Sequence, residues 1–442
     1  MQVDTLVHAR WVIPVEPREV LRDYSLAIAG AKVLDIVPTK QAREVFHARE
    51  TYHLPQHALI PGLINAHTHA AMSLFRGIAD DLPLMEWLNE HVWPAEQKWA
   101  SAEFVRDGAL HAVAEMLRGG TTCFNDMYFF PDETAGAASE AGIRACVGLI
   151  LIDFPSPWAT DAQDYFRKGQ AVHDRFRDHP LVSIALAPHA PYSVSDEVLV
   201  RVRALAEELD LPIHMHVHET DDEVKDAVAR TSERPLQRLL RLGLLSPRLL
   251  AVHATQLRDE EITTLARYGV HVVHCPESNL KLASGFCPVD ALTRRGVGVA
   301  LGTDGPASNN DLDMFGEMRV AALLGKAVAG DARALDAHTV LAMATLNGAR
   351  ALGLDALIGS LRPGKAADIV AVDLGDIETQ ALYDPVAQLI YAAGRDKVSH
   401  VWVAGRPVVR ERALLTLDKT AILERTRLWQ ERLAAFRGRA NR

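Results

Sequence analysis

The chain has 442 residues, of which 48% are apolar and 24% are charged, and its formal net charge is −10. This is the composition of an ordinary globular protein, and the length suits a large barrel that carries a smaller second unit. The acidic balance lacks the electrostatic footprint of a nucleic-acid-binding protein, so we expect a small-molecule partner and no nucleic acid.

The N-terminal part of the chain predicts short strands separated by turns. Two β-rich runs, residues 5–15 and 24–38, are punctuated by glycine and proline. This pattern is typical of a small β domain and contrasts with the longer alternating pattern that follows it.

Between about Ala58 and Gly305 one unit recurs eight times, a short β run that ends in polar residues and is followed by a helical segment. The predicted strands are residues 58–69, 121–128, 144–153, 182–191, 211–220, 249–255, 270–278 and 297–306. Near-continuous apolar strands that alternate with helices predict an α/β fold with a closed (β/α)₈ barrel, over residues 58–361. An open dinucleotide-binding sheet is the alternative, but no GxGxxG motif follows the first strand.

The C-terminal part returns to short strands, at residues 359–374 and 398–410, and ends with an amphipathic helical pattern over 418–438. Because the same style of strand occurs at both ends, we predict a small β-sandwich domain built from residues 1–57 and 362–442. The barrel is then inserted between the two parts of this domain.

The cysteines form no CxxC pair and no dense disulfide framework; they are Cys123, Cys146, Cys275 and Cys287. This usage is typical of free thiols in a reducing compartment. The N-terminus has no apolar signal core, and no apolar run approaches the length of a transmembrane helix. We therefore expect a cytoplasmic protein with no membrane partner.

Polar and titratable residues gather at the predicted carboxyl ends of the strands, where a barrel of this kind builds its active site. They are His67, His69, Asn125, Asp126, Asp153, His189, His214, His216, His218, Glu219, His253, His274 and Asp304. Side chains alternate along a strand, so His67 and His69 point to the same side. Two neutral imidazoles that converge on one point are a typical ligand pair for a divalent transition metal. On the fifth strand, alternation places His214, His216 and His218 on one face and cannot choose among them.

Several motifs resemble the amidohydrolase superfamily, and within it the 5'-methylthioadenosine/S-adenosylhomocysteine deaminases. They are "PGLINAHTHAAMSLFRGIADDLPLMEWL", "APHAPYSVS", "HMHVHETDDEV", "AVHAT", "LGTDGPASNNDLDMFGEM" and "GSLRPGKAADIV". The resemblance covers nearly the whole chain and implies hydrolytic removal of the 6-amino group of an adenine nucleoside, with release of ammonia.

The resemblance also implies one divalent metal ion held by His67, His69, His216 and Asp304. Zinc suits three imidazoles and a carboxylate, and iron(II) and manganese(II) also accept this set. His216 is preferred on the fifth strand because Glu219 follows it at the HxxE spacing of the family. His218 is then expected beside the ligands or in packing, and His214 in the barrel core.

The remaining site residues follow from the same resemblance. Glu219 is expected to carry protons, His253 to orient the attacking water, and Asp304 both to bind the metal and to take the proton of the water. Glu96 is expected to accept hydrogen bonds from the ribose hydroxyls, and His189 to contact the purine.

The chain departs from some family members after the third barrel strand. They use arginines there, but no arginine lies between Arg144 and Arg167, and Phe154 and Trp158 occupy the region. An apolar wall favours a methylthio group over an amino-acid tail, so we expect a preference for 5'-methylthioadenosine.

Two alternatives stay open. One is another deaminase or a dechlorinase of the same superfamily, acting on guanine, adenosine, a pterin or a triazine. The other is a catalytically silent barrel that serves as a binding module, which would require a broken metal set. The family resemblance further predicts a homodimer or homotetramer.

Overall fold

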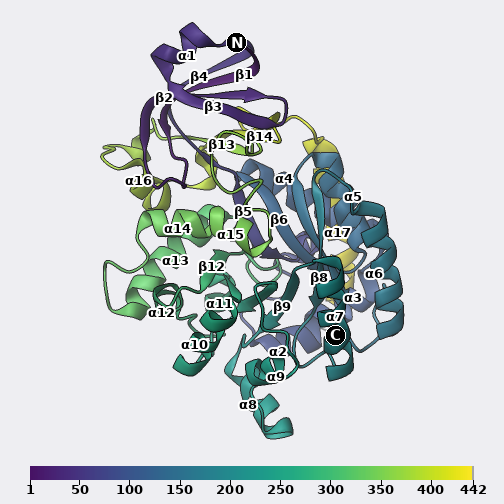
Figure 1. Cartoon of the computed structure of the whole chain (residues 1–442). Helices are drawn as coiled ribbons and strands as arrows, with labels where there is room; N and C mark the ends of the chain where they lie inside the picture. Colours follow the sequence, from purple (N-terminus) through teal and green to yellow (C-terminus); the bar gives the residue numbers. More distant parts are fainter. Residues whose placement is uncertain (441–442) are drawn as a thin grey trace.

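The computed structural model describes residues 1–440, with side chains described to residue 434. Figure 1 shows a barrel with a β domain at one end. The barrel strands are β5 (Leu63–Thr68), β6 (Thr121–Tyr128), β7 (Arg144–Leu151), β8 (Val182–Pro188), β9 (Ile213–Val217), β10 (Leu249–His253), β11 (His271–His274) and β12 (Gly298–Leu301). They neighbour one another in chain order and every pair is parallel. The predicted (β/α)₈ barrel is therefore confirmed.

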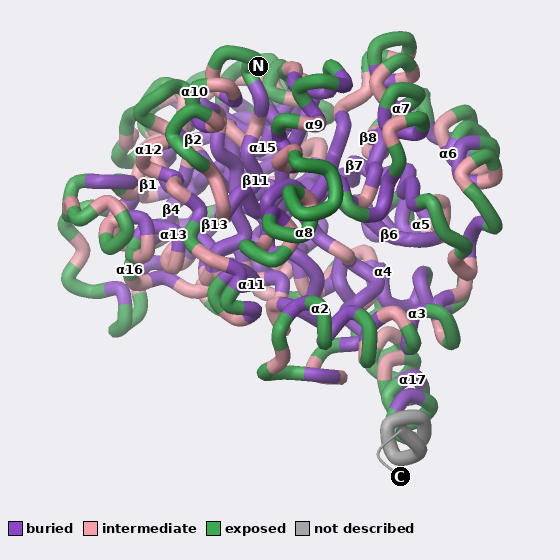
Figure 2. Tube along the Cα trace, turned by 90° about the horizontal axis from the view of Figure 1, so that it is seen from below, coloured by how far each residue is buried: buried purple, intermediate pink, exposed green. Residues whose placement is uncertain are grey.

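Helices follow the barrel strands and most of them cover the outside of the barrel, and the resulting burial on both faces explains the near-continuous apolar character of the strands. They are α4 (Ala102–Arg118), α5 (Pro131–Ala141), α6 (Ala162–Phe176), α7 (Asp196–Leu209), α8 (Asp221–Thr231), α9 (Pro235–Arg241), α10 (Asp259–Tyr268), α11 (Pro276–Lys281), α12 (Val289–Arg294), α13 (Met314–Ala329), α14 (Ala337–Met343) and α15 (Leu346–Ala351). Figure 2 shows buried residues in the strands and exposed residues on the outer helices. Side-chain caps fix several starts: Ser101 accepts from Phe104 N, and Ser195 from Val198 N.

The barrel closes between β5 and β12 by side-chain and loop contacts. Asn65 Oδ1 accepts from Thr303 N at 3.0 Å, and His67 O accepts from Asp304 N at 3.0 Å. The close approach requires glycine at position 302, because a Cβ there would lie 2.8 Å from His67 N. Closure therefore sets His67 and Asp304 side by side.

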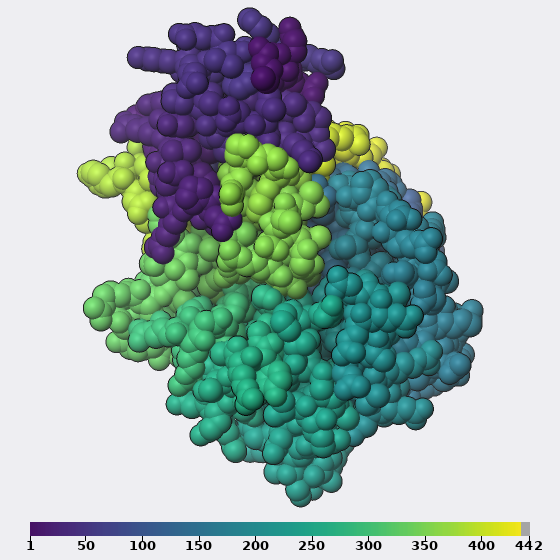
Figure 3. Space-filling model, in the orientation of Figure 1, coloured from purple at the N-terminus to yellow at the C-terminus, as the bar shows by residue number. Residues whose placement is uncertain are grey.

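The β domain is one mixed sheet built from both ends of the chain. Its strands, in spatial order, are β16 (Ala413–Leu414), β15 (Arg406–Arg410), β14 (Val398–Val403), β13 (Ile369–Asp373), β4 (His47–Pro61), β1 (Gln2–Val12), β2 (Leu21–Ala29) and β3 (Lys32–Pro38). The run at 24–38 divides into β2 and β3 at Gly30, whose φ is +57°. In Figure 3 the purple N-terminal residues lie against light-green residues of the C-terminal half.

The sheet curls around its own core. Val7, Leu26, Leu59, Ile369 and Trp402, which come from five different strands, are fully buried in one cluster. The predicted β domain built from both termini is thus confirmed beside the parallel barrel, and its strands form one mixed sheet. The domain limits at 57/58 and 361/362 stay a prediction; β4 continues to Pro61, where it pairs with β13.

Three short segments cover the mouth of the barrel near its first strand. They are α2 (Leu84–Glu86), a π-helix (Trp87–Val92) and α3 (Trp93–Trp99). The predicted C-terminal helix is α17 (Lys419–Ala440), and its Trp429 Nε1 donates to Asp107 Oδ2 on α4 at 2.9 Å. Within residues 1–440, every helix is too short or too polar to span a lipid bilayer.

The remaining short elements connect these units. They are α1 (Thr39–Val45), α16 (Pro385–Tyr391), and the 3₁₀ turns Ala70–Phe75, Ile377–Thr379 and Arg395–Lys397. None of them contributes a side chain to the strand ends apart from the turn Ala70–Phe75, whose Met72 reaches the mouth of the barrel.

A buried ion pair ties the barrel to the β domain and gives a stability prediction. Arg144 donates to both carboxylate oxygens of Asp368, at 2.6 and 3.2 Å, and Asp368 also accepts from Ala404 N. Arg144→Met would leave the carboxylate buried and unpaired, so we expect the free energy of unfolding to fall by about 3–5 kcal/mol. Urea denaturation measures this change.

Arg177→Met is the matched control, because the Arg177 side chain is 62% exposed and its ion-pair partner Asp178 is 93% exposed. This control should change the unfolding free energy by less than about 0.5 kcal/mol. Equal losses in the two variants would contradict the role assigned to the buried pair.

Candidate active site

Metal-ligating atoms from four strand ends meet at the mouth of the barrel. One ligand atom from each of His67, His216, His253 and Asp304 lies within 4.8 Å of the others. His69 Nε2 joins this group at 3.2 Å from Asp304 Oδ1. The structure thus gathers the four expected ligands and adds His253 beside them.

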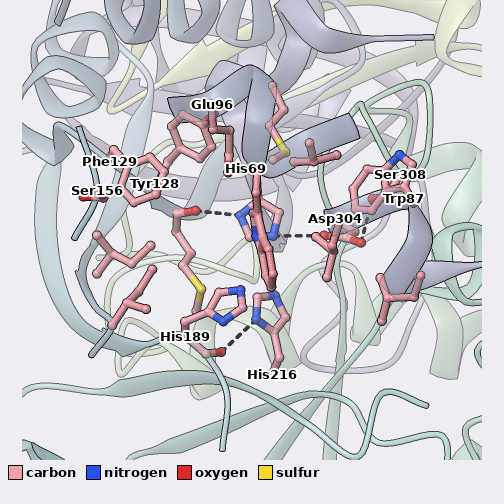
Figure 4. A pocket seen from close by; sticks show the side chains of 18 of the residues that line it. His69, Trp87, Glu96, Tyr128, Phe129, Ser156, His189, His216, Asp304 and Ser308 are labelled. Atoms are coloured by element: carbon pink, nitrogen blue, oxygen red, sulfur yellow. Dashed lines mark hydrogen bonds and ion pairs between the residues drawn. The ribbon is translucent and has the colours of Figure 1, made fainter. Parts of the chain in front are cut away.

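Hydrogen bonds from the outer ring nitrogens orient two of these imidazoles, as Figure 4 shows. His69 Nδ1 lies 2.6 Å from Met127 O, and His216 Nδ1 lies 2.8 Å from His189 O. A carbonyl oxygen only accepts, so each Nδ1 carries the proton and each Nε2 offers its lone pair to the site. This is the tautomer that a metal ligand requires.

Ring nitrogens and a carboxylate oxygen face one another at the centre. His67 Nε2 lies 3.1 Å from Asp304 Oδ1, and His216 Nε2 lies 3.3 Å from His67 Nε2. Where these nitrogens are unprotonated, such close atoms repel unless a cation lies between them. The donor set of three imidazoles and one carboxylate therefore fits a divalent metal ion.

Burial keeps most of these imidazoles neutral. It lowers the pKa of His67 to about 4 and that of His216 well below the usual value. Burial also opposes protonation of His69, but hydrogen bonding and charge from Asp304 prevail and raise its pKa to about 9. The raised pKa of His69 shows that the Asp304 carboxylate creates a negative field at the centre, which favours a cation.

Asp304 has a strained backbone and a firmly held carboxylate. Its φ is +62°, in the left-handed region that non-glycine residues rarely adopt. Its Oδ2 accepts from Ser278 Oγ at 2.6 Å and from Ser308 Oγ at 2.7 Å. Sequence reasoning missed both serines, although each lies within a quoted motif or strand.

Two further histidines of β9 differ in role. His214 Nε2 lies 2.7 Å from His67 Nδ1, so it supports that ligand from the barrel core as expected. The expectation that His218 shares their face is wrong: its φ is +54°, and its Nε2 accepts from Leu236 N at 3.1 Å. Strand alternation ends with β9 at Val217 and does not extend to His218.

Two expected proton-handling residues lie together beside the metal ligands. His253 Nε2 is 3.8 Å from Glu219 Oε1, and burial raises the pKa of Glu219. Glu223 Oε2 accepts from Glu219 N at 2.6 Å, and Asn279 Oδ1 accepts from His253 Nδ1 at 2.8 Å. The sequence contained no signal for Asn279, and Glu223 lay unremarked in the motif of Glu219.

A cavity of about 910 Å³, including its open mouth, lies above this centre. Its apolar wall consists of Met72, Leu84, Trp87, Leu88, Val92, Trp93, Met127, Phe129, Ile150, Ile152 and Leu282. Glu96 and His189 also line it, so both expected substrate contacts face the cavity. Burial raises the pKa of Glu96 to about 7 against the opposing effect of Tyr128, and His189 Nδ1 lies 2.9 Å from Ser193 Oγ.

The loop after β7 supplies only one of the two expected aromatic contacts. Phe154 lines the cavity and is 40% exposed, with its ring centroid 6.0 Å from that of Trp93. Trp158 is buried away from the cavity against Tyr165, which corrects the expectation for it. The cavity-lining residues of the described chain include no arginine or lysine.

Comparisons with known proteins agree with this geometry. The sequence profile of the amidohydrolase family matches residues 58–408. A protein of Teredinibacter turnerae named 5-methylthioadenosine/S-adenosylhomocysteine deaminase is 50% identical over 436 residues, 98% of this chain and 99% of that protein.

Two solved structures share the fold. An adenosine deaminase from Xanthomonas campestris with bound zinc has a TM-score of 0.97 and 54% identity, and the match covers 98% of this chain and 99% of that one. An atrazine chlorohydrolase from Arthrobacter aurescens in complex with zinc has a TM-score of 0.90 and 25% identity, with 96% and 99% covered. This chain belongs to the amidohydrolase family.

Proposed function

We propose that this protein is a metal-dependent hydrolytic deaminase of 5'-methylthioadenosine, S-adenosylhomocysteine, or both. It replaces the 6-amino group of the adenine ring with a 6-oxo group and releases ammonia. The observation that carries the proposal is the buried centre of three imidazoles and one carboxylate, with Glu219 and His253 beside it. The named function of the relatives supports the choice of substrate.

His67, His69, His216 and Asp304 are the residues that would hold the ion. A bound divalent ion supplies Lewis-acid activation of the attacking water. Asp304 Oδ1 faces the imidazoles while its Oδ2 is occupied by two serine hydroxyls. We therefore assign acceptance of the water's proton to Oδ1.

Burial raises the pKa of Glu219, and a carboxyl group whose pKa is raised is suited to the role of proton donor. It protonates the ring nitrogen next to C6 as the water oxygen forms its bond to that carbon. His253 holds the attacking water by its Nε2. The C–N bond then breaks, and the amine leaves as ammonia with the proton that Asp304 took from the water. The proton that remains on the new hydroxyl passes back to the Glu219 carboxylate, which leaves the 6-oxo group and restores Glu219.

The substrate contacts follow from the cavity wall. Glu96 is buried, and a carboxylate in this position accepts hydrogen bonds from both ribose hydroxyls. His189 contacts the purine ring next to the metal ligands. Phe154, at the outer edge of the cavity, packs against the thioether, and the absence of a cationic lining residue in the described chain favours a methylthio group.

Other features remain predictions from the sequence. The limits of the two domains, a homodimeric or homotetrameric assembly, a cytoplasmic location, and the lack of nucleic-acid and membrane partners belong to this group. The alternative substrates guanine, adenosine, a pterin and a triazine are separated by the following experiment.

Zinc-loaded protein should convert 5'-methylthioadenosine to the inosine form and release one ammonia per turnover. Ultraviolet absorbance and an ammonia assay measure this reaction in parallel for 5'-methylthioadenosine, S-adenosylhomocysteine, adenosine, guanine, a pterin and a chlorotriazine. Protein stripped with a chelator should be inactive and regain activity with zinc. Turnover of guanine, the pterin or the triazine alone would reject the proposed substrate, and a larger kcat/KM for S-adenosylhomocysteine would reject the predicted preference.

Glu219→Gln tests proton delivery. The amide keeps the shape of the side chain but cannot supply the proton, so we expect kcat to fall by roughly 10³-fold. Zinc content, measured by elemental analysis, should stay at the wild-type level, because Glu219 is not an assigned ligand. His216→Ala is the contrasting variant and should lose zinc; a Glu219→Gln enzyme with more than about a tenth of the activity would contradict the assigned role.

Glu96→Ala tests the ribose contact. Loss of two charge-assisted hydrogen bonds should raise KM for 5'-methylthioadenosine by roughly tenfold or more. Whatever slow activity the enzyme has on free adenine should stay within about twofold of wild type, because the base has no ribose. Steady-state kinetics on both substrates decides, and equal losses would remove the assignment.

A further inference from the structure

Two consecutive residues of helix α11 reach two different residues of the active site. Ser278 Oγ donates to Asp304 Oδ2 at 2.6 Å, and Asn279 Oδ1 accepts from His253 Nδ1 at 2.8 Å. The two side chains are 0% and 1% exposed. Neither residue is an assigned metal ligand, proton carrier or substrate contact.

The position of α11 in the barrel explains this double contact. His253 ends β10 and Asp304 follows β12, and β11 lies between these two strands. Helix α11 begins two residues after β11, so its first turn lies between the two strand ends. Successive helical residues point about 100° apart, which lets neighbours in one turn reach opposite sides.

Asn279 determines which nitrogen of His253 faces the site. An amide oxygen only accepts, so His253 Nδ1 carries the proton and Nε2 directs its lone pair toward the metal ligands and Glu219. The amide nitrogen of Asn279 has no hydrogen-bond partner in the described chain, so the contact with His253 is the polar function of this side chain. The φ of +73° at His253 makes such support necessary, because the backbone alone does not favour this conformation.

Ser278 determines which oxygen of Asp304 faces the site. Together with Ser308 it occupies Oδ2, which leaves Oδ1 directed at His67 and His69. Rotation of the carboxylate would break both hydroxyl bonds. The serine thus fixes the carboxylate in the orientation that the reaction uses.

We propose that Ser278 and Asn279 are positioning residues that hold Asp304 and His253 in one fixed mutual orientation. A single rigid turn then sets the angle between the group that takes the proton of the water and the group that orients the water. The inference rests on the proposed function, because both residues act only through His253 and Asp304. This fixed orientation stabilises the transition state more than it stabilises the bound substrate, so its loss lowers kcat more than it changes KM.

Ser278→Ala and Asn279→Ala test the proposal in zinc-loaded full-length protein. We expect each to lower kcat for 5'-methylthioadenosine by about tenfold or more, with KM within about twofold of wild type and with unchanged zinc content. Ser284→Ala is the matched control, because Ser284 is also buried but its hydroxyl has no hydrogen-bond partner in the described chain. It should leave kcat unchanged. The proposal would be overturned by variants that keep the wild-type kcat. It would also be overturned by variants in which zinc content falls and KM rises as kcat falls.

Binding measurements separate positioning from a general structural role. An analogue with a tetrahedral, hydroxyl-bearing carbon in place of C6 should bind about tenfold more weakly to Asn279→Ala, while affinity for the inosine product stays within about twofold. In a His253→Asn background, Asn279→Ala should change affinity for the analogue by less than about twofold, because its partner is gone. An equal loss in both backgrounds would show a structural role instead.

The outcomes distinguish this inference from the function on which it rests. A wild-type protein that deaminates 5'-methylthioadenosine, combined with unaffected variants, would overturn the positioning proposal alone. A wild-type protein without deaminase activity would overturn the proposed function and the positioning proposal with it. Should Asn279→Ala fail to fold, Ser278→Ala alone still decides through the kcat and KM comparison.

Discussion

The contact of the Asp304 carboxylate with buried imidazoles is the constraint on which the rest of this structure depends. A carboxylate placed inside a barrel is stable only beside a compensating charge. Here two serine hydroxyls donate to Oδ2, while Oδ1 faces the Nε2 atoms of His67 at 3.1 Å and of His69 at 3.2 Å. The centre is therefore complete only with a cation, and the folded barrel supplies its ligands already in place.

Barrel closure and assembly of this centre are the same structural event. The last strand meets the first through the hydrogen bond from Asp304 N to His67 O and the contacts of Asn65 with Thr303. Glycine at position 302 permits the close approach. A substitution that weakens the contacts between β5 and the residues after β12 would separate the carboxylate from the imidazoles. Fold stability and metal affinity are therefore physically linked.

Strained backbone conformations occur at several places in the chain, and three of them lie at or just after the ends of barrel strands that build the site. His218, His253 and Asp304 all adopt positive φ at the ends of their strands. Each makes a hydrogen bond with another element: Leu236 N donates to His218, His253 donates to Asn279 Oδ1, and Ser278 donates to Asp304. The surrounding helices thus stabilise backbone conformations that the strands alone would not keep. The side chains at the ends of the strands are held in fixed orientations as a result.

The sequence by itself determined the elements and the residue types of the site. Eight apolar runs separated by helical patterns predicted the barrel, because burial on both faces demands continuous apolar strands. The HxH pair His67 and His69 predicted a metal centre, because alternation puts both rings on one side. A local sequence pattern is sufficient to predict a feature when neighbouring residues alone determine that feature.

The tertiary structure decided what depends on contacts between distant segments. It turned His218 away from the ligands, buried Trp158 against Tyr165, and brought Ser278 and Asn279 to residues on two other strands. No periodicity encodes these outcomes, because strand alternation ends where the loops begin. Orientation there is set by packing and hydrogen bonding across the closed barrel, and such partners exist only once the chain has folded.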